Sequence, residues 1–87
     1  QLHRRLVKLT IHNFAFEPAR LVVSRGTRLV WTNQDSDPHT VTASTAGWSS
    51  AALDTGNHFA AVMSRDGTFS YSCTIHPYMH GIVIVRG

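Results

Sequence analysis

The chain alternates between apolar and polar residues along much of its length, which is the period expected of β-strands with one buried face. Turn-forming residues that include a glycine interrupt the alternation at 24–27 and 64–67. No segment shows the apolar spacing of a helix long enough to cover a core. The clearest strand candidates are residues 7–11, 14–16, 21–23, 29–33, 39–43, 68–73 and 81–85. The last of these is apolar on both faces, so we expect it to lie centrally in a sheet.

Two further segments are harder to assign. The pattern of residues 58–63 suits either a strand or a helix, but the turn that follows favours a strand. Residues 44–57 carry no clear period, and we expect a long surface excursion with one helical turn. Six or seven short strands with turn signals every 8–12 residues are typical of an antiparallel β-sandwich. The sequence therefore predicts one all-β domain over residues 1–87.

The composition agrees with a compact domain and excludes several classes of protein. Hydrophobic residues make up 43% of the chain and charged residues only 15%, which excludes a disordered tail. A single cysteine, Cys73, excludes an internal disulfide and any zinc site built on two or more thiolates. No apolar run reaches the roughly 18–20 residues of a membrane span. Because the chain opens with Gln1 and further polar and basic residues, we expect a mature secreted protein or an excised domain.

Basic residues outnumber acidic ones by eight to five, which gives a formal net charge of +3 and a pI near 9.8. Six of the eight precede Trp31. We interpret them as a solvated strand face, with a preference for acidic partners as the alternative. The pattern is not that of a nucleic-acid-binding arm, so we expect no nucleic acid among the partners.

One segment, residues 73–81, concentrates metal-binding side chains between two predicted strands. Cys73, His76 and Met79 bring a thiolate, an imidazole and a thioether together at Cys-x2-His-x2-Met spacing. Soft sulfur ligands with imidazole select copper, and two histidines and a cysteine with a weak axial methionine form a blue-copper site. That geometry requires a second histidine. His39 fits because it begins a strand directly after the loop that ends at Pro38.

Each of these side chains has an ordinary explanation when taken alone. A lone cysteine in a β-protein is most often a small core residue, and a lone methionine is a core filler. Their combination on one loop, with a histidine at a strand start, is hard to obtain from packing alone. We therefore predict one copper ion with His39, Cys73, His76 and axial Met79 as its ligands.

The remaining histidines and methionine receive structural interpretations. Met63 is expected in the core. His80 competes with Met79 for the axial position, but we expect a strand residue there to point to the opposite side. We interpret His3, His12 and His58 as surface or strand-edge residues, because none has a partner at ligand spacing.

Several other segments match the pattern of a known family. Residues 14–19 and 21–23 are similar to its early strands, and residues 25–34 to its glycine turn and tryptophan-containing strand. Residues 38–41 are similar to the segment that carries the first histidine ligand, and 67–73 to the strand that leads into the ligand loop. The chain resembles the cupredoxins, small type 1 copper electron carriers, and within them the amicyanin group, which has the same short gap between His76 and Met79.

This resemblance implies a Greek-key sandwich that shuttles one electron by cycling copper between Cu(II) and Cu(I). Because four protein ligands leave no open position for a substrate, we expect no enzymatic activity. The surface around His76, Pro77 and Tyr78 is expected to form an apolar patch with Ile75 and Pro38. Such a patch suits transient docking of protein redox partners such as a cytochrome c or a dehydrogenase. We expect a monomer in the periplasm or another extracytoplasmic compartment.

Three alternatives remain open at this stage. The chain could be a copper-trafficking or storage protein, although such sites tend to be richer in methionine or cysteine than this one. It could be a metal-free sandwich with Cys73 in its core. It could also be the cupredoxin domain of a larger oxidase or of a membrane-anchored protein.

Two further expectations concern the surroundings of the site. Thr40 and Thr74 each follow a predicted ligand, and we expect a hydrogen bond between their hydroxyls to join the two segments. We also expect the sandwich to fold without metal, on a core of Trp31, Phe14, Phe16, Phe69 and the valines and isoleucines.

Overall fold

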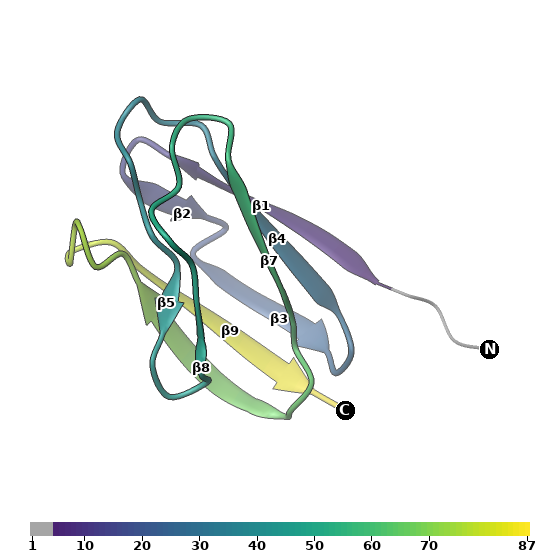
Figure 1. Ribbon diagram of the computed structural model, residues 1–87. Coiled ribbons are helices and arrows are strands. Elements are labelled where there is room, and N and C mark those ends of the chain that lie inside the picture. The colour runs from purple at the N-terminus through teal and green to yellow at the C-terminus, as the bar shows by residue number, and fades with distance from the viewer. Residues whose placement is uncertain (1–4) are drawn as a thin grey trace.

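The computed structural model describes residues 5–87 as two β-sheets packed face to face (Figure 1). Within these residues there is no helix, and hence none that could cross a membrane. The strands are β1 (Leu6–His12), β2 (Ala15–Glu17), β3 (Arg20–Ser24), β4 (Arg28–Asn33), β5 (Thr42–Ala43), β6 (Trp48–Ser49), β7 (His58–Val62), β8 (Gly67–Ser72) and β9 (His80–Arg86). The all-β prediction is confirmed.

Strands that follow one another along the chain do not all lie in the same sheet. One sheet has the order β2-β1-β4-β7, and the other has the order β3-β9-β8-β5-β6. β9 pairs with β3 on one side and β8 on the other, so the prediction that the last strand lies centrally is confirmed. Residues 58–62 are a strand, as the turn after them predicted.

The pairing is mixed, which differs from the purely antiparallel sandwich that we expected. β1 runs parallel to β4, and β3 runs parallel to β9. The reason is that β1 connects to β4 through β2 and through β3 of the other sheet, so the chain returns to the first sheet in its original direction. A parallel pair needs a long crossover of this kind, whereas a hairpin gives an antiparallel pair.

The core lies between the sheets and is built from the inward-facing residues of the alternating strands. Trp31 and Phe16 are fully buried as predicted, and the Trp31 indole N–H donates to the Tyr71 hydroxyl at 3.2 Å. Phe69 packs against the core while remaining partly buried. Met63 is buried at 2% exposure, as expected of a core filler.

Phe14 is the exception among the predicted core residues, since 39% of its surface is exposed. Asn13 and Phe14 form the two-residue turn between β1 and β2, and both have positive φ, 54° and 56°. The left-handed turn breaks the alternation that seemed to continue through Phe14 to Phe16. The prediction of a core position for Phe14 is therefore wrong.

The segment 44–57 begins with one turn of helical spacing, as we expected, in which the Ala43 carbonyl accepts the N–H groups of Ala46 and Gly47 at 3.2 and 2.9 Å, and it continues into a short strand. β6 pairs with β5, and Trp48 packs on Trp31 with ring centroids 5.3 Å apart. Leu53 is buried and exchanges two backbone hydrogen bonds with His39, at 3.1 and 2.7 Å. The segment lacks a period because isolated residues, and not one continuous face, reach the core.

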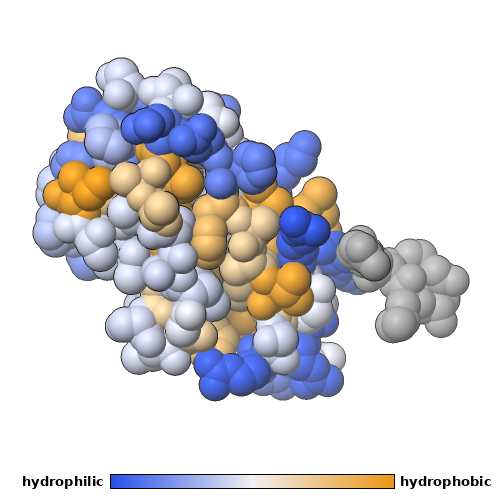
Figure 2. All heavy atoms as spheres, in the orientation of Figure 1, coloured by the Kyte–Doolittle hydropathy of each residue, from blue (hydrophilic) through white to orange (hydrophobic). Residues whose placement is uncertain are grey.

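The surface carries apolar residues in separate groups among hydrophilic ones, as Figure 2 shows for one face. One such group lies at the edge where Figure 1 places the loop between β8 and β9. That loop, residues 73–79, lies at one end of the sandwich, whereas β1 begins and β9 ends toward the other end (Figure 1).

Candidate metal centre

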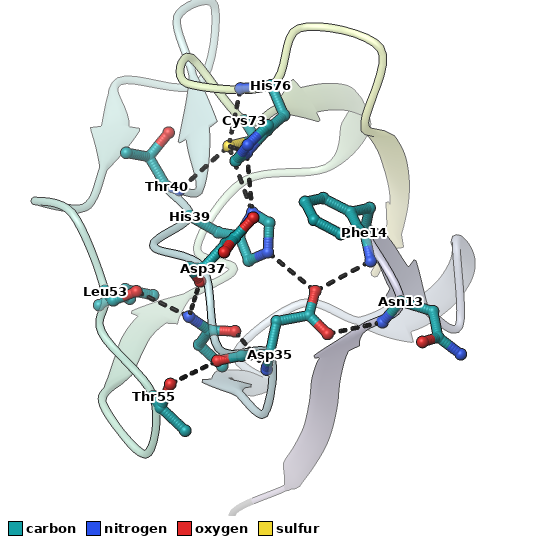
Figure 3. Close-up of polar contacts among 11 residues, drawn as sticks. Asn13, Phe14, Asp35, Asp37, His39, Thr40, Leu53, Thr55, Cys73 and His76 are labelled. Carbon is teal, nitrogen blue, oxygen red and sulfur yellow. Dashed lines mark hydrogen bonds and ion pairs between the residues drawn. The ribbon is translucent and has the colours of Figure 1, made fainter.

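Three of the predicted ligands converge at the end of the sandwich where β8 ends (Figure 3). The Cys73 Sγ lies 3.8 Å from the Nδ1 of His39 and 3.8 Å from the Nδ1 of His76. The two Nδ1 atoms are 3.2 Å apart. Cys73 and His39 are fully buried, and His76 is half-buried. Among residues 5–87, these three side chains are the histidine, cysteine or acidic residues that lie close enough together to hold one metal ion.

The separations of these donors fit one transition-metal ion. Bonds of about 2.0–2.1 Å to nitrogen and 2.3 Å to sulfur, the values for zinc, place nitrogen and sulfur about 3.8 Å apart around a trigonal ion. The same bonds place two nitrogens about 3.5 Å apart, slightly more than observed here. One thiolate with two imidazoles is a donor set that selects copper. The residues therefore fit a copper ion without rearrangement of their backbone.

The surroundings of Cys73 favour the ionised, thiolate form of its sulfur. The backbone N–H groups of Thr40 and His76 each donate to Sγ at 3.3 Å. Burial alone would raise the pKa of the thiol, but these N–H groups and the two imidazoles lower the pKa of Cys73 to about 6. A negative sulfur at neutral pH is the form that binds metals.

His39 is oriented by a carboxylate that the sequence analysis missed. Its Nε2 lies 2.8 Å from the Oδ2 of Asp35, so Nε2 carries the proton and Nδ1 presents its lone pair to the site. Burial opposes the charge on Asp35, but the N–H groups of Phe14 and Asn13 and the His39 ring together hold its pKa below the ordinary value. Asp35 and Asp37 both lie in the polar loop before His39, and the sequence does not distinguish which carboxylate meets the imidazole.

Asn33, at the end of β4, holds the loop that carries Asp35. Its side-chain amide donates to the carbonyls of Asp37 and Leu53 at 2.9 and 2.7 Å. Its oxygen accepts the N–H of Asp35 at 2.8 Å. Asn33 is fully buried, so these three bonds fix the path of the chain from β4 to His39.

The predicted bond between the two ligand segments is present. The hydroxyls of Thr40 and Thr74 lie 3.0 Å apart, and the Thr74 N–H donates to the Thr40 Oγ1 at 2.8 Å. The expectation is confirmed, and the second bond was not foreseen. Together they attach the residue after His39 to the residue after Cys73.

Met79 is buried at 2% exposure and closes the loop through its backbone. Its carbonyl accepts the Cys73 N–H at 3.2 Å, and its N–H donates to the His76 carbonyl at 3.0 Å. Its role as axial ligand stays a prediction. His80 is exposed on β9. His12 and His58 are exposed and lie outside the cluster, and His3 lies outside the described residues.

Phe14 covers the two histidines at the site. Its ring centroid lies 5.3 Å from that of His39 and 5.1 Å from that of His76, with interplanar angles of 89° and 80°. On the outer side of the site, Ile75 and Tyr78 are 44% and 66% exposed, and Pro38 and Pro77 are also exposed. Ile75, Pro77 and Tyr78 neighbour His76 in the loop, and the Tyr78 ring centroid lies 6.1 Å from that of His76, so these residues form an apolar rim beside it.

Comparison with known proteins identifies the family. The cupredoxin-like domain model matches residues 1–85. The chain belongs to the cupredoxin-like family. Within it, the chain is 29% identical over 85 residues to amicyanin of Paracoccus denitrificans, covering 92% of this chain and 65% of that protein. The chain thus spans slightly less than two thirds of the length of that relative.

Solved structures agree with this assignment. The Cu(I) form of an amicyanin mutant superimposes with a TM-score of 0.87 at 25% identity, covering 99% of this chain and 87% of the other. A copper-containing nitrite reductase from Thermus scotoductus SA-01 has a TM-score of 0.88 at 23% identity, and the match covers 99% of this chain but 23% of the reductase. The second likeness concerns the fold alone. As an amicyanin-like cupredoxin with this donor cluster, the chain takes copper as its cofactor.

Proposed function

We propose that this chain is a type 1 copper electron-transfer protein with His39, Cys73, His76 and axial Met79 as the ligands of one ion. The observation that carries the proposal is the convergence of one thiolate and two imidazole nitrogens within 4.8 Å of one another. The bound ion would supply the Cu(II)/Cu(I) couple. A single cupredoxin domain over residues 1–87 suffices to hold it.

The residues of the chain keep the site nearly unchanged while its charge changes by one. Two N–H donors stabilise the negative sulfur of Cys73, so its position does not depend on the ion alone. The carboxylate of Asp35 holds the His39 ring in one tautomer. Because these groups are already in place, little reorganisation is needed when an electron enters or leaves.

The chain is proposed to carry electrons and not to catalyse a reaction on a substrate. Four protein ligands leave no open coordination position, and an open position is what a catalytic metal requires. Met79 is buried on the loop that also carries Cys73 and His76, which supports its assignment as the fourth ligand.

Electrons are proposed to pass through the exposed side of His76. Ile75, Pro77 and Tyr78 present an apolar surface beside this half-buried imidazole. Small apolar surfaces suit short-lived contacts with a protein redox partner, such as a cytochrome c or a dehydrogenase. Such a carrier is expected to act as a monomer in the periplasm or another extracytoplasmic compartment.

Titration of the apoprotein with Cu(II), followed by optical and EPR spectroscopy, tests this function. We expect one equivalent to give an intense blue absorption from sulfur-to-copper charge transfer and the narrow hyperfine splitting of a type 1 site. The Cys73→Ser variant should lose the blue band, while His12→Ala, at an exposed histidine away from the site, should keep it. A colourless, tetragonal Cu(II) spectrum from the unaltered protein would refute the proposal.

A further inference from the structure

The turn between β1 and β2 has an unusual backbone for its sequence. Asn13 and Phe14 both adopt the left-handed region, with φ of 54° and 56°. Two-residue turns of this kind require positive φ at both positions, and Asn-Gly is the pair that satisfies them at least cost. A bulky side chain in the second position is strained. The strain indicates that other contacts hold Phe14 there.

One carboxylate supplies those contacts. The Asp35 Oδ1 accepts the N–H of Asn13 at 2.7 Å, and its Oδ2 accepts the N–H of Phe14 at 2.9 Å. The same Oδ2 accepts from the Nε2 of His39 at 2.8 Å. Figure 3 shows Asp35 between the turn and the histidine, with bonds to both. Asp35 therefore fixes the turn and one metal ligand to each other.

The side chain of Phe14 then lies against both ligand histidines. Its contacts with His39 and His76 are edge-to-face, at centroid distances of 5.3 and 5.1 Å. The two histidines differ in what else holds them. His39 is buried and bonded to Asp35, whereas His76 is half-buried, and within residues 5–87 its ring has polar contacts with the two other donors of the site alone. The Tyr78 ring also lies near His76, with centroids 6.1 Å apart, but Phe14 is closer at 5.1 Å and contacts both histidines.

We propose that the β1–β2 turn is a cap on the metal centre, in which Asp35 positions Phe14 so that its ring holds His76 in place and slows metal release. Phe14 and Asp35 are positioning residues, since neither supplies a ligand atom. The inference rests on the proposed metal site but not on electron transfer. It explains why a strained phenylalanine occupies this turn although 39% of its surface is exposed.

Metal release into an excess of chelator measures the effect of the cap. Phe14→Ala and Phe14→Gly should each release Cu(II) roughly tenfold faster. A tenfold change in rate corresponds to the loss of about 1.4 kcal/mol of aromatic contact. Phe14→Tyr should stay within about twofold of the unaltered protein, because its ring makes the same contacts. Leu6→Ala, at an apolar residue of β1 that is 53% exposed, is the matched control and should not change the rate.

The glycine variant separates a cap from a mere turn. Phe14→Gly relieves the positive φ, so a purely structural role for Phe14 predicts a more stable protein with unchanged release. The cap predicts a protein at least as stable that nevertheless loses its metal faster. Unchanged release from Phe14→Gly and Phe14→Ala would overturn the proposal.

A double-mutant cycle tests whether Asp35 acts through Phe14. Asp35→Ala should also speed release, and the double variant should release more slowly than the product of the two single effects predicts. Strictly multiplicative effects would overturn the positioning role of Asp35.

Zn(II) release, measured beside copper, keeps this test separate from the proposed function. Zn(II) binds the same thiolate and imidazole donors without redox chemistry. If the unaltered protein lacks a type 1 spectrum but Phe14→Gly still releases Zn(II) faster, the electron-transfer proposal fails and the cap stands. If the type 1 spectrum is present and neither metal is released faster, the cap fails alone.

Discussion

Replacing Thr40 by valine removes the hydroxyl that joins the two ligand segments while keeping the shape of the side chain. In the folded protein the Thr40 Oγ1 accepts the Thr74 N–H at 2.8 Å and lies 3.0 Å from the Thr74 hydroxyl. Thr40 is 7% exposed whereas Thr74 is exposed, so water can reach the freed groups of Thr74 and replace part of what is lost. Each of the two lost hydrogen bonds then contributes about 1 kcal/mol net to the free energy of unfolding. We expect a loss of about 2 kcal/mol in the free energy of unfolding.

Chemical and thermal unfolding of the apoprotein check this value. For a domain of this size, about 2 kcal/mol corresponds to a fall of roughly 8–16 °C in Tm. Thr40→Ser is the matched control, since it keeps the oxygen and loses only a methyl group. A Thr40→Val variant within about 0.5 kcal/mol of the unaltered protein would refute the reasoning, because that is the scatter of ordinary surface substitutions. So would a Thr40→Ser variant that is as unstable as Thr40→Val.

Three more predictions concern the metal and the core. Met79→Leu should keep copper bound and blue but raise its reduction potential, because the identity of the axial ligand affects that potential. If voltammetry finds an unchanged potential, Met79 is not a ligand. Removing the metal should leave a β-sheet circular dichroism spectrum and lower Tm by at least about 15 °C. The reason is that an ion present at roughly 1,000 times its Kd adds about 4 kcal/mol to the free energy of unfolding. A random-coil spectrum of the apoprotein would contradict this. Burial raises the pKa of Tyr71 from 10.0 to about 12, so the free energy of unfolding should be unaffected below pH 10 and fall as the pH rises from 10 to 12. Near-ultraviolet absorbance should show a tyrosinate step near pH 12 that is absent in Tyr71→Phe, and a Tyr71 that ionises near pH 10 would contradict the buried position.

The candidate site residues that could be predicted from the sequence are those whose side-chain types rarely occur together. Cys73, His76 and Met79 share one short loop, and few structural needs place a thiol, an imidazole and a thioether there. His39 could be added because a strand start after a proline is a position that faces the end of a sandwich. The Thr40–Thr74 bond followed from the same reasoning, since each threonine neighbours a predicted ligand.

Asp35 and Phe14 could not be placed because their roles depend on contacts between distant segments. Asp35 lies in a polar loop where acidic residues are common, and its partners Asn13 and Phe14 are more than 20 positions away. Phe14 continued an alternating pattern, and only the left-handed turn takes it out of the core. In the segment 44–57, single anchors such as Leu53 carry no periodic signal. Pattern reasoning detects faces of regular elements and misses residues that act one at a time.

The last strand begins beside Met79 and runs for seven residues to Arg86, so the C-terminal Gly87 stands roughly 20 Å from the ligand loop. A linker that joins Gly87 to a solid surface would leave the apolar rim beside His76 facing away from that surface. The protein could therefore be mounted on an electrode by a C-terminal tag with its metal-binding end turned toward a soluble partner. Mounting through the apolar rim instead would turn that end toward the electrode and the C-terminus toward the solution. Comparing the two orientations by voltammetry would map the direction in which electrons enter the molecule.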